Sequence, residues 1–263
     1  MILSRLSSFI RYFFSATNAH GIHSPFVYEL YTRIISMRKR YYVFAELKAY
    51  RELLEKNTRE ITLVDLGAGS FNIPALPKQV RVNDIYKRSS HSEKDTELLF
   101  RLVLHFQPQH ILELGTCLGV STLYLAKANK KAQVYTLEGN PDYAALARKA
   151  FIAFQTHNIT LIEGNIHQTL QITMDRIPSL DFAFLDAHHA YEPTVQFFKT
   201  CLTKVNEYSV IVLDDIHWSP EMERAWETIK AMPEVKQTID LFQFGIVFFK
   251  PGQVKEHFVL RYI

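Results

Sequence analysis

The pattern of apolar and polar positions divides the chain into two parts of different character. In the first part, apolar residues recur every three or four positions over 28–37 and 41–56, which predicts helices, and a short apolar run covers 61–66. In the second part, apolar runs of four to six residues alternate with longer helical patterns, as in strand–helix–strand units. We therefore expect an N-terminal helical extension with a short hairpin or cap over 1–94, followed by an α/β domain over 95–263.

Seven strands are predicted in the second part, with helices between them. The strands are 110–114, 133–138, 159–163, 181–186, 209–214, 238–242 and 246–250, and the helices are 98–106, 120–128, 143–157, 192–205 and 221–232, with a turn near 168–174. The last two strands are separated by too few residues for a crossover helix, so they must pair antiparallel. The pattern thus predicts a parallel α/β sheet that ends in a C-terminal antiparallel hairpin.

The first sixteen residues have apolar side chains at helical spacing. Arg11 interrupts this run, whereas the apolar region of a signal peptide would be unbroken, so we interpret it as part of the mature protein. The pattern predicts an amphipathic helix that packs on the body of the protein or on a second subunit, which makes a homodimer one expectation. A peripheral membrane helix is the alternative. The apolar residues are Ile2, Leu6, Phe9, Ile10, Phe13 and Phe14.

Composition and charge exclude several classes of protein. The 263 residues are 48% hydrophobic and 22% charged, as in a globular chain whose core needs no crosslinks. The net charge of +3 is too small to indicate nucleic acid or a membrane surface as a partner. Two cysteines, Cys117 and Cys201, are too few for a disulfide framework and favour a cytoplasmic setting. No apolar stretch reaches the roughly 18 residues that a membrane span needs.

A turn with two glycines follows the predicted strand 110–114. Gly115 and Gly119 allow a sharp turn and the close approach of a ligand to the backbone, and a predicted helix begins directly afterwards. Glu138 ends the next strand, where its carboxylate can accept hydrogen bonds from both hydroxyls of a ribose. The two features together predict a site for an adenosine-type ligand.

These motifs resemble the S-adenosyl-L-methionine site of class I methyltransferases, in particular the small-molecule O-methyltransferases of the catechol and caffeoyl-CoA type. The resemblance runs from about residue 93 to about residue 250 and rests on Glu113-Leu114-Gly115, on Gly119 and Ser121, and on the run LEGNPD over 137–142. It implies a Rossmann-like seven-stranded methyltransferase sheet and S-adenosyl-L-methionine as cofactor, with Glu138 on the ribose and Asn165 on the adenine. The expected cofactor-binding residues are Glu113, Gly115, Gly119, Ser121, Glu138, Asn165 and Asp186.

Carboxylates follow two of the predicted strands. Asp186 follows the fourth strand, and Asp214 and Asp215 follow the fifth, so all three should lie at the carboxyl edge of the sheet, where ligands bind in open α/β folds. Mg²⁺ prefers such oxygen ligands, and the resemblance supports a metal at these three residues, although the family usually has Asn where Asp215 stands. The alternative is a metal-free enzyme in which Asp186 holds the methionine ammonium or orients the base.

His189 stands three residues after Asp186, where the catechol-type family usually has a lysine base. A histidine in this place resembles the metal-dependent sugar and macrolide O-methyltransferases, which makes His189 the expected general base and Asp186 its catalytic partner. An imidazole with the ordinary pKa near 6.5 can accept a proton at neutral pH. The alternative is a purely structural His189 that begins a helix.

A second glycine motif precedes this domain. Gly67-Ala68-Gly69 follows a short apolar run and also resembles a methyltransferase motif, with Asp84 further on. Two prolines follow it instead of a helical pattern, and a ligand-binding turn needs a helix N-terminus beside it. We therefore interpret this stretch as a hairpin or loop that caps the core.

The expected function is the transfer of a methyl group to a hydroxyl oxygen of a small molecule, with help from a divalent metal. A nucleic-acid acceptor is not expected, because the Asn/Asp-Pro-Pro-aromatic motif of base methylases is absent after the fourth strand. The alternatives are a metal-free methyltransferase with another small-molecule acceptor and a non-catalytic cofactor-binding scaffold.

Overall fold

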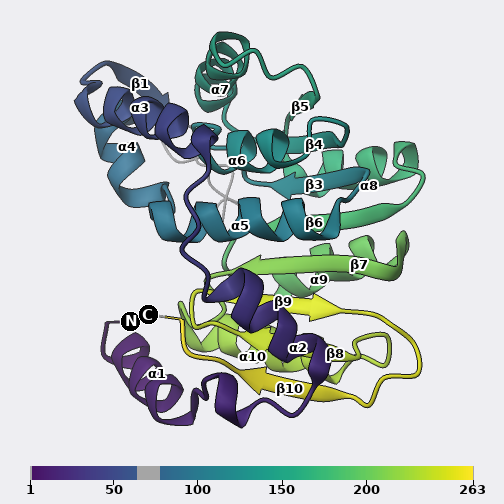
Figure 1. The fold of residues 1–263 in the computed structure, drawn as a ribbon. Coiled ribbons are helices and arrows are strands. Elements are labelled where there is room, and N and C mark those ends of the chain that lie inside the picture. Colours follow the sequence, from purple (N-terminus) through teal and green to yellow (C-terminus); the bar gives the residue numbers. More distant parts are fainter. Residues whose placement is uncertain (1, 64–77, 263) are drawn as a thin grey trace. The chain divides into compact units, whose positions relative to one another are not determined.

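The computed structural model describes residues 2–63 and 78–262, which form two compact units (Figure 1). The central unit is Arg38–Thr173, and the terminal unit combines the residues up to Met37 with those from Met174 onward. These units are defined by compactness and differ from the predicted division between residues 94 and 95. The predicted boundary separates an extension from an α/β domain, and it stays a prediction.

Three parallel strands form the sheet of the central unit, in the order β3-β4-β5. All three strands and α6 have the bounds predicted from the sequence. β3 and β4 are mostly buried, whereas β5, at the edge of the sheet, has only intermediate and exposed residues. α6 is buried along nearly its whole length, as expected for a helix that is apolar all round. The elements are β3 (His110–Leu114), α6 (Val120–Ala128), β4 (Gln133–Glu138), α7 (Pro141–Ala153) and β5 (Ile159–Glu163).

The rest of the central unit precedes this sheet in the sequence. β1 pairs antiparallel with β2, α3 packs against α4 and α6, and the helix α4 was not predicted. Ser92 precedes α5, and its hydroxyl oxygen caps the helix by accepting the N–H of Asp95 at 3.2 Å. Gly67-Ala68-Gly69 lies outside the described residues. The elements are α3 (Tyr42–Lys56), β1 (Glu60–Leu63), β2 (Lys78–Arg81), α4 (Val82–Ser89) and α5 (Glu93–Phe106); α8 (Ile166–Arg176) follows β5 and replaces a predicted turn.

Five strands form the sheet of the terminal unit, in the order β10-β8-β9-β7-β6. β8 and β9 pair antiparallel, which confirms the predicted hairpin, and β6 runs parallel to β7. β10, which pairs parallel with β8, was not predicted. The elements are β6 (Leu180–Leu185), α9 (Tyr191–Leu202), β7 (Val205–Asp214), α10 (Pro220–Ala231), β8 (Gln237–Asp240), β9 (Phe244–Phe248) and β10 (Glu256–Val259).

The N-terminal segment packs against the C-terminal strands of the same unit, as Figure 1 shows. It contains α1 (Ile2–Ser15), a short turn of helix over Ala19–Gly21, and α2 (Pro25–Leu30), which continues as a π-helical turn over Tyr31–Ile35. Tyr12 of α1 is buried and donates its hydroxyl to the carbonyl of Leu260 at 2.6 Å. None of the helices in the described ranges is long and apolar enough to cross a membrane.

Candidate functional site

The turn after β3 brings the backbone into conformations that favour glycine. Gly115 and Gly119 have φ values of 95° and 75°. A Cβ at position 119 would also lie 2.7 Å from the ring of Phe151, which is closer than carbon atoms approach. Ser121 is buried in the first turn of the helix that follows. The predicted turn is therefore present, with glycine required at 119 for two separate reasons.

The carboxylate of Glu138 lies against this turn. Glu138 ends β4 and is buried; its Oε2 accepts the N–H of Cys117, and its Oε1 accepts the N–H of Asn140, each at 2.7 Å. Each carboxylate oxygen can accept a further hydrogen bond, so the same group can also receive hydroxyl donors. This geometry suits the predicted ribose contact.

Two other predicted cofactor residues have structural contacts of their own. Glu113 is fully buried, and its Oε2 accepts the hydroxyls of Thr122 and Thr136. These two hydrogen bonds link α6, the helix after the turn, to β4. Asn165 accepts the N–H of His167 with its side-chain oxygen at the start of α8. Direct cofactor contacts of Glu113 and Asn165 stay predictions.

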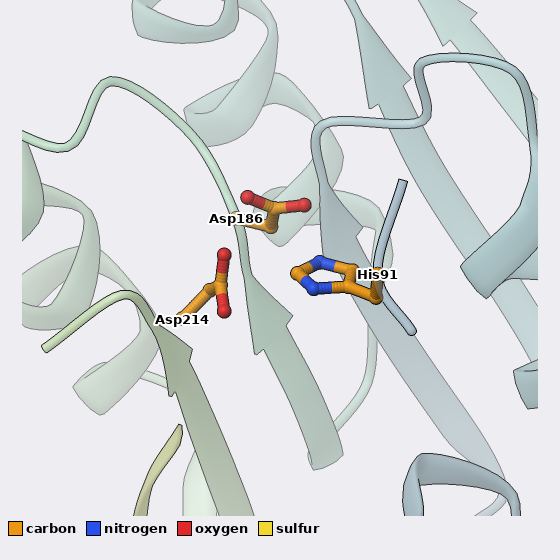
Figure 2. A group of neighbouring side chains, drawn as sticks. All are labelled: His91, Asp186 and Asp214. Carbon is orange, nitrogen blue, oxygen red and sulfur yellow. The ribbon is translucent and has the colours of Figure 1, made fainter. Parts of the chain in front are cut away.

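Three aspartates and a histidine gather at the carboxyl ends of β6 and β7 in the terminal unit. Figure 2 shows the carboxylates of Asp186 and Asp214, and an oxygen of each lies within 4.8 Å of the other. Ligand atoms of His189, Asp214 and Asp215 lie equally close together, and Nε2 of His189 lies 3.3 Å from Oδ1 of Asp186. The structure thus brings together the four residues predicted for the metal and the base; we call them the acidic cluster.

The loops that carry this cluster adopt left-handed backbone conformations. The φ values are 67° for His188, 31° for His189 and 51° for Asp215. Such conformations cost a non-glycine residue roughly 1–2 kcal/mol, although Asp and His tolerate them better than most. Backbone strain of this kind is typical of functional sites, where the surrounding structure maintains it.

The charges of the acidic cluster change the pKa of His189. Burial lowers this pKa, but the hydrogen bond to Asp186 and the charges of Asp186, Asp214 and Asp215 outweigh burial and raise it to about 9. The imidazole of His189 is therefore protonated at neutral pH in the field of these carboxylates. This raised pKa could not be predicted from the sequence, because the number of carboxylates around the ring depends on the fold.

Two residues of this site were not predicted. Gln243, in the β8–β9 turn, donates Nε2 to Oδ1 of Asp214 at 2.9 Å and to Oδ1 of Asp215 at 2.7 Å. Arg5 of α1 lies 3.5 Å from Oδ1 of Asp215 and donates to Oε1 of Gln243 at 3.2 Å. No local pattern could reveal Arg5, because it is 210 positions from Asp215 in the sequence.

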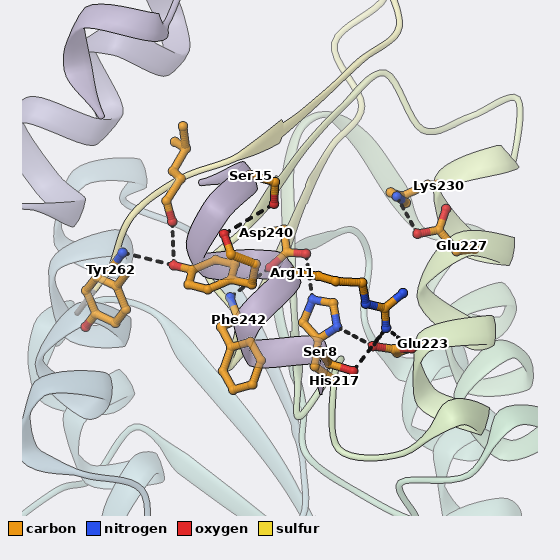
Figure 3. A network of polar contacts seen from close by, with 12 residues as sticks. Ser8, Arg11, Ser15, His217, Glu223, Glu227, Lys230, Asp240, Phe242 and Tyr262 are labelled. Atoms are coloured by element: carbon orange, nitrogen blue, oxygen red, sulfur yellow. Dashed lines mark hydrogen bonds and ion pairs between the residues drawn. The ribbon is translucent and has the colours of Figure 1, made fainter. Parts of the chain in front are cut away.

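A second charged network lies in the same unit (Figure 3). Nε2 of His217 lies 2.7 Å from Oδ2 of Asp240, and Nδ1 lies 3.0 Å from Oε1 of Glu223. Arg11 of α1 donates to both carboxylate oxygens of Glu223 at 3.1 Å. The network therefore fastens α1 to α10 and to the loop after β7.

We expect the contribution of His217 to stability to fall as the pH rises. Burial lowers the pKa of His217, but its contacts with Asp240 and Glu223 raise it above the ordinary value of 6.5. A histidine whose pKa is raised by folding stabilises the fold fully below its unfolded pKa, and this stabilisation is lost as the pH rises through the folded pKa. Urea unfolding from about pH 6 to about pH 9 should show the gap between wild type and His217→Gln shrinking. A gap that stays constant would contradict the expectation.

Comparison with known proteins identifies the fold and the domain. Residues 112–216 match the family model described as a methyltransferase domain. The structure is similar to the solved O-methyltransferase of Bacillus cereus in complex with SAH, with a TM-score of 0.55 and 20% identity over 81% of this chain and 92% of that one. It is also similar to the O-methyltransferase TomG of Streptomyces achromogenes in complex with SAM, with a TM-score of 0.56 and 18% identity over 85% and 95%. The chain therefore shares the fold of these O-methyltransferases, and its residues 112–216 match a methyltransferase domain.

Curated relatives of this chain are named catechol O-methyltransferases. The protein from Niastella koreensis is 31% identical over 131 residues, which are 49% of this chain and 57% of the relative. The protein from Mycobacterium tuberculosis is 26% identical over 155 residues, which are 54% and 65% of the two chains. The chain spans about half the length of the curated relatives that it matches.

The range matched by the family model holds most, but not all, of the residues described above. The glycine turn, Glu138 and the acidic cluster all fall within residues 112–216. Arg5 and Gln243, which contact Asp215, lie outside that range. The matched range therefore includes the carboxylates of the cluster but not the guanidinium and amide groups that contact them in this chain.

Proposed function

We propose that this protein transfers a methyl group from S-adenosyl-L-methionine to a hydroxyl oxygen of a small molecule, with help from a divalent cation such as Mg²⁺. The observation that carries the proposal is the buried carboxylate of Glu138 against the glycine turn, within a domain of the methyltransferase family. The names of the catechol O-methyltransferase relatives support the hydroxyl acceptor and its small size.

The donor is proposed to bind in the central unit. Glu138 would accept the hydroxyls of its ribose, and Gly115 and Gly119 would let the backbone approach its methionine part. We propose that Ser121, Glu113 and Asn165 of the same unit also contribute to cofactor binding. Titration calorimetry tests this part directly, because binding of S-adenosyl-L-methionine without binding of NAD supports it, and binding of neither would favour a scaffold.

The donor set of the acidic cluster fits a hard divalent cation. Asp186, Asp214 and Asp215 offer carboxylate oxygens close together, which are the ligands that Mg²⁺ and Mn²⁺ prefer. When bound, such an ion lowers the pKa of an acceptor hydroxyl and fixes its position. We propose these three aspartates as the metal ligands.

His189 is the proposed general base. Its imidazole would take the hydroxyl proton while the acceptor oxygen forms a bond to the methyl carbon, and the bond from that carbon to sulfur breaks to leave a neutral thioether. The hydrogen bond to Asp186 orients the imidazole. Because the carboxylates keep His189 protonated, its basic form requires that their negative charge be offset.

Removal of divalent metal is expected to lower turnover about tenfold or more. The assay would combine S-adenosyl-L-methionine with dihydroxybenzoate as a probe acceptor and measure the demethylated donor by chromatography, before and after EDTA. Added Mg²⁺ or Mn²⁺ should restore the rate, while calorimetry should show donor binding unchanged by EDTA. Full turnover in EDTA would instead favour the metal-free enzyme, in which the aspartates act without an ion.

A homodimer is also part of the proposal. α1 presents a row of exposed apolar side chains on the side away from its buried Tyr12: Leu6, Ile10, Phe13 and Phe14. Light scattering coupled to size exclusion would show the mass of a dimer if a second copy covers this row. Cytoplasmic location and the exclusion of nucleic-acid acceptors stay predictions.

A further inference from the structure

Several contacts fix the position of α1 in the terminal unit. Arg11 forms two hydrogen bonds with Glu223, and the buried hydroxyl of Tyr12 bonds the carbonyl of Leu260. Just beyond the helix, Thr17 forms a β-bridge with Leu260. These contacts fix the rotation of α1 about its axis, so that Arg5, at helical spacing from Ser8 and Tyr12, turns toward the same side as they do.

Arg5 reaches the acidic cluster from this helix. Its guanidinium lies 3.5 Å from Asp215, bonds Gln243 at 3.2 Å, and stacks over the ring of Trp218 with 4.7 Å to the centroid. An arginine side chain stays charged at every physiological pH and stacks well on aromatic rings. Arg5 is therefore a fixed positive charge that belongs to the chain itself.

Arg5 contacts a carboxylate oxygen of a proposed metal ligand. Oδ1 of Asp215 receives both Arg5 and the amide of Gln243, and that amide also bonds Asp214. A divalent ion bound to Oδ1 of Asp215 would compete with these contacts, and an ion bound to either oxygen would be repelled by the guanidinium. Three carboxylates in one cluster favour bound positive charge, and Arg5 supplies part of it in advance.

We infer that Arg5 is an internal competitor of the divalent cation, so that α1 lowers the affinity of the acidic cluster for metal. This inference rests on the proposed metal site. Arg5 acts through Asp215 and is a positioning residue rather than a catalytic one. It also ties metal binding to a segment that lies outside the matched methyltransferase domain.

The test is a titration of the metal-free full chain with Mn²⁺, followed by electron paramagnetic resonance, without donor or acceptor. We expect Arg5→Gln to bind Mn²⁺ about 2- to 5-fold more tightly than the wild type, the effect of removing one partly exposed ion pair. Arg5→Lys, which keeps the charge, should stay near the wild type. Arg11→Gln is the matched control, because it loosens α1 at Glu223 without removing a charge from the cluster.

The controls separate the ways in which the inference can fail. Asp214→Asn should abolish Mn²⁺ binding in the wild-type and Arg5→Gln backgrounds, and binding that survives it would place the ion elsewhere and overturn the inference. Equal tightening by Arg11→Gln would overturn it as well, since loosening of the helix would then suffice. If the wild type binds Mn²⁺ and Arg5→Gln binds it no more tightly, this inference alone is overturned. Absence of Mn²⁺ binding in both proteins would overturn the proposed metal site together with it.

Discussion

Replacing Glu138 by Gln is expected to weaken the binding of S-adenosyl-L-methionine about 10- to 100-fold. A hydrogen bond to a charged acceptor contributes about 1.5–3 kcal/mol, and the change removes the charge from the acceptor proposed for the ribose. Calorimetry with the purified variant gives the dissociation constant. Thermal unfolding of the same variant is needed beside it, because Glu138 also accepts the N–H groups of Cys117 and Asn140.

The matched control for this change is Glu46→Gln. Glu46 also belongs to the central unit and bonds Lys127 at 2.8 Å, but it borders a hollow with Gln133 and Asn158, at the opposite ends of β4 and β5. We expect this variant to bind the donor as the wild type does. If Glu138→Gln also binds the donor normally, the ribose contact is wrong and the donor part of the proposal falls.

Replacing His189 by Gln is expected to lower kcat about 10²- to 10⁴-fold, the usual contribution of a general base. Affinity for S-adenosyl-L-methionine should change little, because His189 is not among the residues proposed to bind the donor. Turnover of dihydroxybenzoate in saturating donor and Mg²⁺ measures kcat, and calorimetry measures donor affinity.

His188→Gln is the control for this second change. His188 stands next to His189 in the same left-handed stretch of backbone, and its ring packs against Phe197. The control should lose little activity, since the imidazole bonded to Asp186 is intact. Equal losses in both variants would indicate damage to the loop, and normal turnover in His189→Gln would remove the imidazole from the mechanism.

The core of the fold could be predicted because its signals are local and strong. Each strand of the β3-β4-β5 sheet is a short apolar run that ends at a turn residue, so both its position and its bounds follow from the sequence. β10 was missed because, of its four residues, only Phe258 is buried, and the strand pairs at an edge. α4 was missed because its eight residues contain only two buried apolar side chains, Val82 and Ile85.

The candidate site likewise contains residues that could be predicted from the sequence and others that could not. The acids after β6 and β7 could be placed because carboxyl ends of parallel strands share one edge of a sheet. The contacts of Arg5 and Gln243 with Asp215 could not, because they depend on how distant segments pack. The raised pKa of His189 depends on those same placements, since it reflects three carboxylates from two separate loops.

The pairing of the two chain termini has a practical consequence for anyone who purifies this protein. The backbone N–H of Tyr262 donates to the hydroxyl of Tyr12, which itself reaches Leu260, so the last residues of the chain rest on its first helix. An affinity tag left on either terminus would crowd the helix that carries Arg5. Trimming the chain to residues 112–216 would remove that helix and the surface on which it rests, and by the inference above would change the affinity of the remaining carboxylates for metal.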